Sequence, residues 1–191
     1  MPTSKSSGSF RRNRKGFTLI EIVVVMGVIA VLSSLMLGYS QRNSKQVLLA
    51  TSQAKLASIF ARAKFLSIQS FFYSGPRNEI ICGHGVGIDT DTKKIFIFQD
   101  IIDEGPCSKD LDDYELDAGD KILGGELNQL NLADKGVNIT TDSEYVIFIP
   151  PEPVVKFSGS TEESSVFISD ADNENFKLGV TVTKDGQIRM D

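Results

Sequence analysis

The sequence predicts an α+β fold, in which a long N-terminal helix with a membrane-spanning first half precedes an antiparallel β-sheet head. Three observations support this prediction. Residues 18–72 contain no proline and only two glycines, and residues 17–39 are almost entirely apolar. After residue 73, short alternations of apolar and polar residues replace the helical pattern, with Gly, Pro, Asn and Asp between them. A length of 191 residues allows such a helix and one ordinary domain.

Charge divides the chain into distinct segments. Residues 1–16 hold five basic residues and no acid, 17–39 hold a single charge, and 40–72 again hold five basic residues and no acid. The remaining residues, 73–191, hold 10 basic and 24 acidic residues, a net charge of −14 within a total of −5. We therefore expect a basic leader (1–16), an apolar helix (17–39), an amphipathic continuation of that helix (40–73) and an acidic head (74–191).

The apolar segment is long enough to cross a bilayer, because about 20 helical residues span the hydrocarbon core. Basic residues immediately before it place the N-terminus in the cytoplasm and the head outside. A secretory signal peptide has a shorter apolar core and a small-residue cleavage site, which this segment lacks. A plain single-pass anchor fits the length, but neither alternative explains Glu21, since a carboxylate within a membrane helix costs roughly 2.5–3.5 kcal/mol.

The string KGFTLIEIVVVMGVIAVL at 15–32 resembles the processing signal of type IV prepilins and pseudopilins. Its elements are a basic leader ending in Gly16, the aromatic Phe17, Thr18-Leu19, the acid Glu21 and an unbroken apolar helix. The resemblance implies that a prepilin peptidase cuts between Gly16 and Phe17 and methylates the new amino group of Phe17. A glycine at the cut suits close approach of a protease to the backbone.

The resemblance also implies partners and a location. The Phe17 amine of a neighbouring subunit would pair with Glu21, since a charge in an apolar filament core is tolerable only when paired. The partners would be other pilin or pseudopilin subunits and an inner-membrane assembly platform, with the lipid bilayer before assembly. The chain would be single-pass in the cytoplasmic (inner) membrane, and would then enter a pilus or pseudopilus at the cell exterior or in the periplasm.

The predicted helix beyond residue 40 has two apolar faces on either side of a narrow polar strip. One face is rich in large residues and the other in alanines. The first face holds Leu49, Leu56, Ile59, Phe60, Ala63 and Leu66; the second holds Ala50, Ala54, Ala57, Ala61, Phe65, Ile68 and Phe72; the strip holds Thr51, Lys55, Ser58, Arg62 and Gln69. A surface helix needs only one apolar face, so two apolar faces indicate that this helix packs both on its own head and on neighbouring molecules. The alternative is a helix that is buried within its own domain.

Ser74-Gly75-Pro76 should end the helix. The head then shows period-2 strands separated by turn residues. Strands are expected at 86–89, 94–101, 137–141, 145–149, 154–157, 165–169, 177–183 and 187–190. The head loosely resembles an H-type minor pseudopilin, in which a Phe-x-Gly element (here within 155–159) precedes a closing hairpin (179–190). This resemblance, and a helix without proline, favour a minor rather than a major subunit.

The two cysteines, Cys82 and Cys107, are expected to form a disulfide outside the cytoplasm, with two unpaired buried thiols as the alternative. The acidic stretch at 107–120 could bind calcium, as some pseudopilins do. Its spacing lacks the Asp-x-Asp-x-Asp-Gly order of a calcium loop, so a solvated acidic loop is favoured and no cofactor or metal site is predicted.

Catalysis is not expected. His84 is the only histidine, and no nucleophile, phosphate-loop or zinc motif occurs. The favoured function is a structural filament subunit of a type IV pilus or a type II secretion-like system. The alternatives are a DNA-capturing minor pilin of a competence pilus, which the acidic head disfavours despite Lys93 and Lys94, and a single-pass membrane-anchored receptor that keeps residues 1–16.

Overall fold

The computed structural model describes residues 17–72, 80–102, 107, 110, 113–151, 154–159 and 162–191. The predicted leader 1–16, including Gly16, and the predicted helix terminator Ser74-Gly75-Pro76 lie outside the described residues. The chain divides into two compact units: the first ends at Asn43, and the second is Ser44–Asp191. Each unit is described by itself.

The helix α1 (Leu19–Phe72) has 54 residues, as the absence of proline predicts. Thr18 precedes its first turn and accepts hydrogen bonds there: the Glu21 N–H lies 3.1 Å from the Thr18 carbonyl oxygen and 3.4 Å from Thr18 Oγ1. In the first unit, 18 residues at Leu19–Met36 are long and apolar enough to cross a membrane, and their side chains are all exposed.

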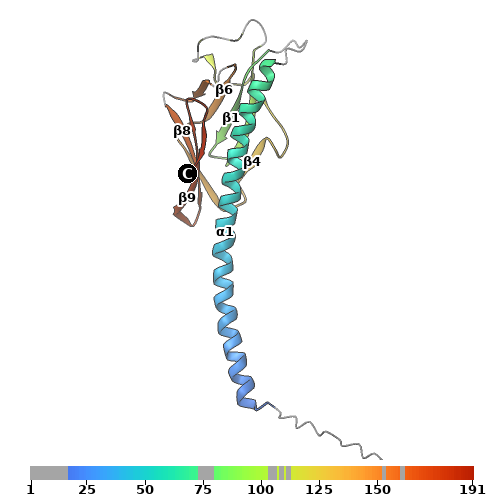
Figure 1. Ribbon diagram of the computed structural model, residues 1–191, viewed down its shortest axis with the longest axis vertical. Helices are drawn as coiled ribbons and strands as arrows, with labels where there is room; N and C mark the ends of the chain where they lie inside the picture. The colour runs from blue at the N-terminus through green and yellow to red at the C-terminus, as the bar shows by residue number, and fades with distance from the viewer. Residues whose placement is uncertain are drawn as a thin grey trace, which may run out of the picture. The chain divides into compact units, whose positions relative to one another are not determined.

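The second unit contains two antiparallel sheets (Figure 1). Sheet A has the order β3-β2-β1-β6-β7, and β4 pairs with β2 beside β3. Its strands are β1 (Ile80–Asp89), β2 (Lys94–Ile102), β3 (Lys121–Ile122), β4 (Gln129–Asn131), β6 (Tyr145–Ile149) and β7 (Val154–Phe157). Sheet B has the order β10-β9-β8-β5, with β5 (Val137–Thr141), β8 (Glu163–Asp170), β9 (Asn173–Thr183) and β10 (Ile188–Met190).

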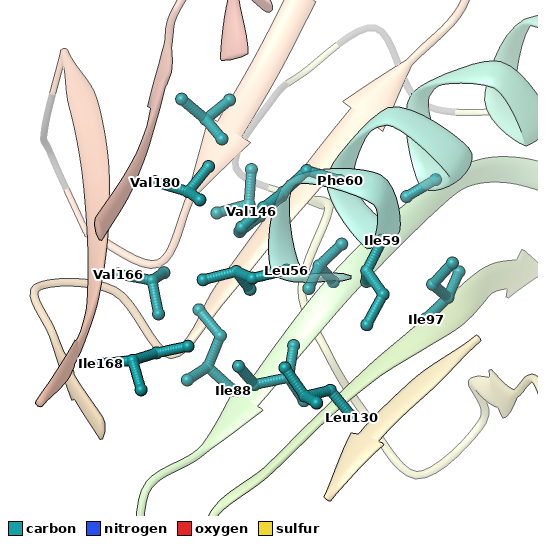
Figure 2. Close-up of a cluster of buried hydrophobic side chains, with 14 of the residues drawn as sticks. Leu56, Ile59, Phe60, Ile88, Ile97, Leu130, Val146, Val166, Ile168 and Val180 are labelled. Carbon is teal, nitrogen blue, oxygen red and sulfur yellow. The ribbon is translucent and has the colours of Figure 1, made fainter. Parts of the chain in front are cut away.

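The hydrophobic core of this unit lies between the second part of α1 and both sheets. Figure 2 shows Leu56, Ile59 and Phe60 of α1 among side chains from sheet A and sheet B; all three are 0% exposed. Alternation along the strands gives sheet A a second, smaller cluster on its other face, because Val146 and Phe148 join the main core while Ile147 joins the second cluster.

The glycines of β1 accommodate two aromatic rings from β2. Gly85 pairs directly with Phe98, and Gly87 with Phe96. A β-carbon at Gly85 would lie 2.2 Å from the Phe98 ring, and one at Gly87 would lie 2.6 Å from the Phe96 ring. The rings therefore occupy the space that side chains on β1 would need, which explains why a strand that is buried along most of its length is rich in glycine.

The predicted fold class, a long N-terminal helix followed by an antiparallel β head, is confirmed. The strands predicted at 137–141, 145–149 and 154–157 coincide with β5, β6 and β7. The first strand is longer than predicted, since it begins at Ile80 rather than at residue 86, and β3 and β4 were not predicted.

Candidate functional site

The N-terminal turn of α1 is a capped helix start with an acid in its first turn. Thr18 and Glu21 stand in the order Thr-x-x-Glu, which is the capping-box pattern. The printed contact is the one from the Glu21 N–H to Thr18 Oγ1, at 3.4 Å. The Thr-x-x-Glu order was the sequence signal for this cap, and it was missed; the contact itself involves the backbone of Glu21 and the side chain of Thr18.

Glu21 has no ion-pair partner within the part of the chain that the structure describes. It lies among exposed apolar side chains, including Phe17 (76% exposed), Ile20 and Val24. An acid in apolar surroundings requires a cation from elsewhere if it is to remain charged. Any such partner must come from residues outside the described ranges or from another molecule.

The side chains of residues 17–36 form an extensive exposed apolar surface. Exposed surfaces of this size mark contact with a membrane or with another protein. The length and composition of Leu19–Met36 suit both a bilayer span and a helix packed among like helices.

In the second unit, the two predicted faces of α1 are used differently. Leu49, Leu56 and Ile59 of the first face are at most 1% exposed and lie in the core. The alanine-rich face is largely exposed, with Phe65 at 64% and Ile68 at 39%. The helix is therefore not simply buried in its own domain, and it leaves a second apolar face available for contact.

Basic and polar residues along α1 also bind it to the head. Lys45 Nζ lies 3.1 Å from Asp170 Oδ2 and 2.6 Å from Asp172 Oδ2. The Arg62 Nε–H donates to Asn128 Oδ1 at 2.7 Å, and Lys64 Nζ donates to the Gly186 carbonyl at 2.9 Å.

Further helix contacts come from Gln53. Its Nε2 donates to the carbonyls of Gly179 (2.7 Å) and Asp191 (2.9 Å). Among these contacts, only those of Lys45 join a basic charge of the helix to acidic charges of the head; the others end on an amide or on backbone carbonyls. The charge segregation in the sequence was the available signal, but it could not identify these partners.

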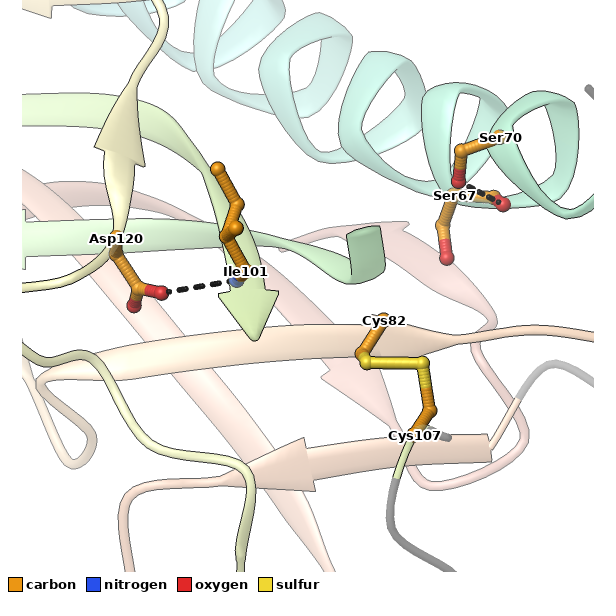
Figure 3. Close-up of a disulfide and its surroundings, with 6 residues drawn as sticks. All are labelled: Ser67, Ser70, Cys82, Ile101, Cys107 and Asp120. Carbon is orange, nitrogen blue, oxygen red and sulfur yellow. Dashed lines mark hydrogen bonds between the residues drawn. A yellow bond between two sulfur atoms is a disulfide. The ribbon is translucent and has the colours of Figure 1, made fainter. Parts of the chain in front are cut away.

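Cys82 and Cys107 are joined by a disulfide with Cα atoms 5.4 Å apart (Figure 3). Tyr114 and Leu116, from the following loop, join Cys82 in the second apolar cluster of sheet A. The loop therefore covers the face of sheet A that points away from the main core, and the disulfide fixes its beginning.

The acidic residues of this loop make local hydrogen bonds. Asp120 Oδ1 accepts from the Ile101 N–H at 3.4 Å, as drawn in Figure 3, and Asp120 Oδ2 accepts from the Asp117 N–H at 3.1 Å. Asp100 is only 8% exposed; burial, and then the carboxylates of Asp120 and Asp117, raise its pKa to about 7. Among the described residues no group of three or more His, Cys, Asp or Glu side chains could hold a metal ion.

His84 has a structural setting. It is 2% exposed, and burial lowers its pKa to about 4, so the ring is neutral at pH 7. Its Nε2 lies 3.2 Å from Gln99 Nε2, while Nδ1 is buried without a hydrogen-bond partner.

Comparison with known proteins identifies one motif and two similar folds. Residues 11–37 match the family described as the prokaryotic N-terminal methylation motif. The structure is similar to the minor pseudopilin EpsH from the type 2 secretion system of Vibrio cholerae, with a TM-score of 0.46 and 16% identity over 75% of this chain and 95% of that one. It is also similar to the type IV minor pilin FimU of Pseudomonas aeruginosa, with a TM-score of 0.48 and 12% identity over 80% and 92% of the two chains. No curated protein matches the sequence at a significant level.

Proposed function

We propose that this chain, which carries the N-terminal methylation motif of type IV prepilins and pseudopilins, is a minor pilin or pseudopilin: a structural subunit of a type IV pilus or a type II secretion-like filament. The observation that carries the proposal is the motif at 11–37, together with a helix whose first part exposes mostly apolar side chains and a single charged one, Glu21. The assignment to a minor rather than a major subunit, and to one filament system, is part of the proposal.

Processing would convert the chain into its assembling form. A prepilin peptidase would cut between Gly16 and Phe17 on the cytoplasmic side and methylate the Phe17 amine. Loss of a leader with five basic residues would change the formal charge from −5 to −10. The mature chain, 17–191, would begin one residue before the cap of α1.

Before assembly, the apolar part of α1 would span the inner membrane with the head outside. This placement follows from the basic residues ahead of the helix and from the length of Leu19–Met36. The disulfide between Cys82 and Cys107 suits a head outside the cytoplasm, where cysteines are oxidised.

In the filament, Glu21 would pair with the methylated Phe17 amine of a neighbouring subunit. Glu21 has no ion-pair partner among the described residues of its own chain, so an intermolecular amine would supply the missing charge. Further along α1, the exposed alanine-rich face would pack against neighbouring helices, because small side chains let helix backbones approach closely.

The mass of the mature N-terminus tests the proposal. We expect a chain that begins with N-methylated Phe17 when the protein is made with a prepilin peptidase, and an intact leader with a Gly16→Ala variant. Gly8→Ala, elsewhere in the leader, is the matched control and should be cut normally. An intact leader on the wild-type chain in cells that process other prepilins would contradict the proposal and would favour a membrane-anchored receptor.

Glu21→Gln tests the charge pair separately from processing. The variant should be inserted and cut like the wild type but should fail to co-purify with filament subunits. Normal incorporation of Glu21→Gln into filaments would refute the role of the charge pair while leaving the subunit assignment intact.

A further inference from the structure

A cavity of about 420 Å³ lies over the outer face of sheet B, in the second unit. Along β8, Val166 and Ile168 point into the core, while Phe167 and Ser169 alternate with them and line the cavity. The cavity therefore lies on the side of sheet B opposite the core. Its volume is within the range of small-molecule binding pockets.

Strand register places the polar side chains of the cavity in one row. Asn138 of β5 pairs with Ser169 of β8, and Ser169 pairs with Lys177 of β9. Because neighbouring strands lie about 4.8 Å apart, the row from Asn138 to Lys177 spans about 10 Å. The adjacent row runs from Thr140 to Phe167, so the cavity offers hydroxyl and amide groups beside one aromatic ring.

At one end of the row stands Lys93, from the turn between β1 and β2. Its Nζ donates to the Val137 carbonyl at 2.9 Å and to Asn138 Oδ1 at 3.0 Å. An ammonium group has three donors, so one remains available to a ligand. The backbone at Lys93 has φ of 53°, a left-handed conformation that is uncommon for residues other than glycine and that positions this lysine over the sheet.

At the other end stands Lys177, whose Nζ lies 4.8 Å from the centroid of the Phe167 ring. The ring itself lies over Gly179, where a β-carbon would come within 2.4 Å of it. Within the described part of the chain, neither Lys93 nor Lys177 has a carboxylate at ion-pair distance. Both ammonium groups are thus held over the cavity with hydrogen-bonding capacity left unused.

The charge of this cavity is opposite to that of the head around it. Residues 73–191 have a net charge of −14, but the cavity contains two lysines and a single acid, Glu174. The long-range field of the head repels polyanions, whereas the two ammonium groups attract an anionic group that has already entered the cavity. A small ligand with few negative charges is both weakly repelled by the head and attracted by the two ammonium groups.

We propose that this cavity binds an acidic saccharide, a sugar unit whose carboxylate lies between Lys93 and Lys177 and whose hydroxyl groups contact Asn138, Thr140 and Ser169. The neutral hydroxyl and amide lining matches a hydroxyl-rich ligand better than it matches an acidic peptide or a nucleic acid. No residue that lines the cavity belongs to α1, the element proposed to assemble the filament. A failure of saccharide binding would therefore not contradict the proposed subunit role.

The test is titration of the full-length chain in detergent with sodium glucuronate, followed by calorimetry and saturation-transfer NMR. Glucuronate should bind, and glucose, which has the same ring without the carboxylate, should bind at least tenfold more weakly. Lys177→Gln and Lys93→Gln should each raise the Kd for glucuronate about tenfold, the effect of losing one charge-assisted hydrogen bond. Lys94→Gln, an exposed neighbour outside the cavity, is the matched control and should leave the Kd unchanged.

Lys177 is exposed, so Lys177→Gln should keep the circular dichroism spectrum of the wild type. This variant therefore tests the proposal even where Lys93→Gln disturbs the β1–β2 turn. The proposal is overturned if glucose binds as well as glucuronate, or if Lys94→Gln weakens binding as much as Lys177→Gln. It is also overturned if inorganic phosphate or a triglutamate peptide binds more tightly than glucuronate. Finally, it is overturned if no probe binds to protein at about 1 mM when the probe is present at a roughly 20-fold molar excess.

Discussion

Replacing Asp100 by Asn should change how the stability of the head depends on pH. Asp100 is buried on β2, and burial together with the nearby carboxylates of Asp120 and Asp117 raises its pKa to about 7 from an ordinary 3.8. Between pH 3.8 and 7, the folded state therefore holds a proton that the unfolded state has lost. Stability from this group is fully present below pH 3.8 and is lost as the pH rises through 7.

The size of the effect follows from the shift of the pKa. A difference of about three pH units corresponds to about 4 kcal/mol, at roughly 1.4 kcal/mol per unit. His84 acts in the opposite direction, because burial lowers its pKa to about 4 from 6.5. Its contribution, about 3 kcal/mol, is present above pH 6.5 and is lost as the pH falls towards 4. The contributions of these two groups nearly cancel between pH 4 and 6.5, so together they add little pH dependence to the stability of the wild type there.

In Asp100→Asn, the contribution of His84 is no longer cancelled, and stability relative to the wild type should rise with pH by about 3 kcal/mol between pH 4 and 6.5. The measurement is urea denaturation of the unit Ser44–Asp191, followed by circular dichroism from pH 3.5 to 8.5. Asp185→Asn, at an exposed turn, is the matched control. Parallel pH profiles for Asp100→Asn and wild type would refute the reasoning.

Three further variants test the packing of the head, and each is compared with the wild type by its free energy of unfolding. Leu56→Ala, in the core, should lower it by about 2–5 kcal/mol, and a loss below 1 kcal/mol would mean that α1 is not part of the core. Gly85→Ala should lower it by at least about 1–3 kcal/mol because its β-carbon would collide with a buried ring, whereas Gly124→Ala meets nothing within 4 Å; equal effects would contradict the ring placement. Replacing Cys82 and Cys107 together by serine should cost about 3 kcal/mol, given their separation of 25 residues, and unchanged stability would show that the link does not restrain the unfolded chain.

Local patterns predicted the parts of the fold whose environment is local. The alternation at 145–149 places Val146 and Phe148 in the core, and the spacing of Leu49, Leu56 and Ile59 defines the buried face of α1. In both cases, the period of the apolar residues follows the geometry of the element itself. The alanine-rich face was visible in the same way, because it shares the helical period.

Other features depend on contacts that no local pattern records. β3 and β4 are two and three residues long, too short for a periodic signal, and they exist because β2 offers an edge. The start of β1 contains Gly83 and Gly85, which disfavour a strand; a side chain at Gly85 is replaced by the Phe98 ring of β2, and Gly83 lies against Ile147 and Phe148 of β6. Likewise, the burial of Asp100 and the contact of Lys45 with Asp170 follow from the tertiary arrangement. The sequence around Asp100 or Lys45 does not distinguish it from the sequence around an exposed charged residue.

The cap at Thr18 has a consequence for the electrostatics of a chain cleaved before Phe17. The N-terminus of a helix carries about half a positive charge from its aligned peptide dipoles. A new ammonium group on Phe17 would lie next to that partial charge, which destabilises the first turn. Glu21, in the first turn of α1, supplies the negative charge that offsets both. The same carboxylate would therefore keep the first turn of a processed chain helical while the chain is still a monomer, before any neighbour provides a partner.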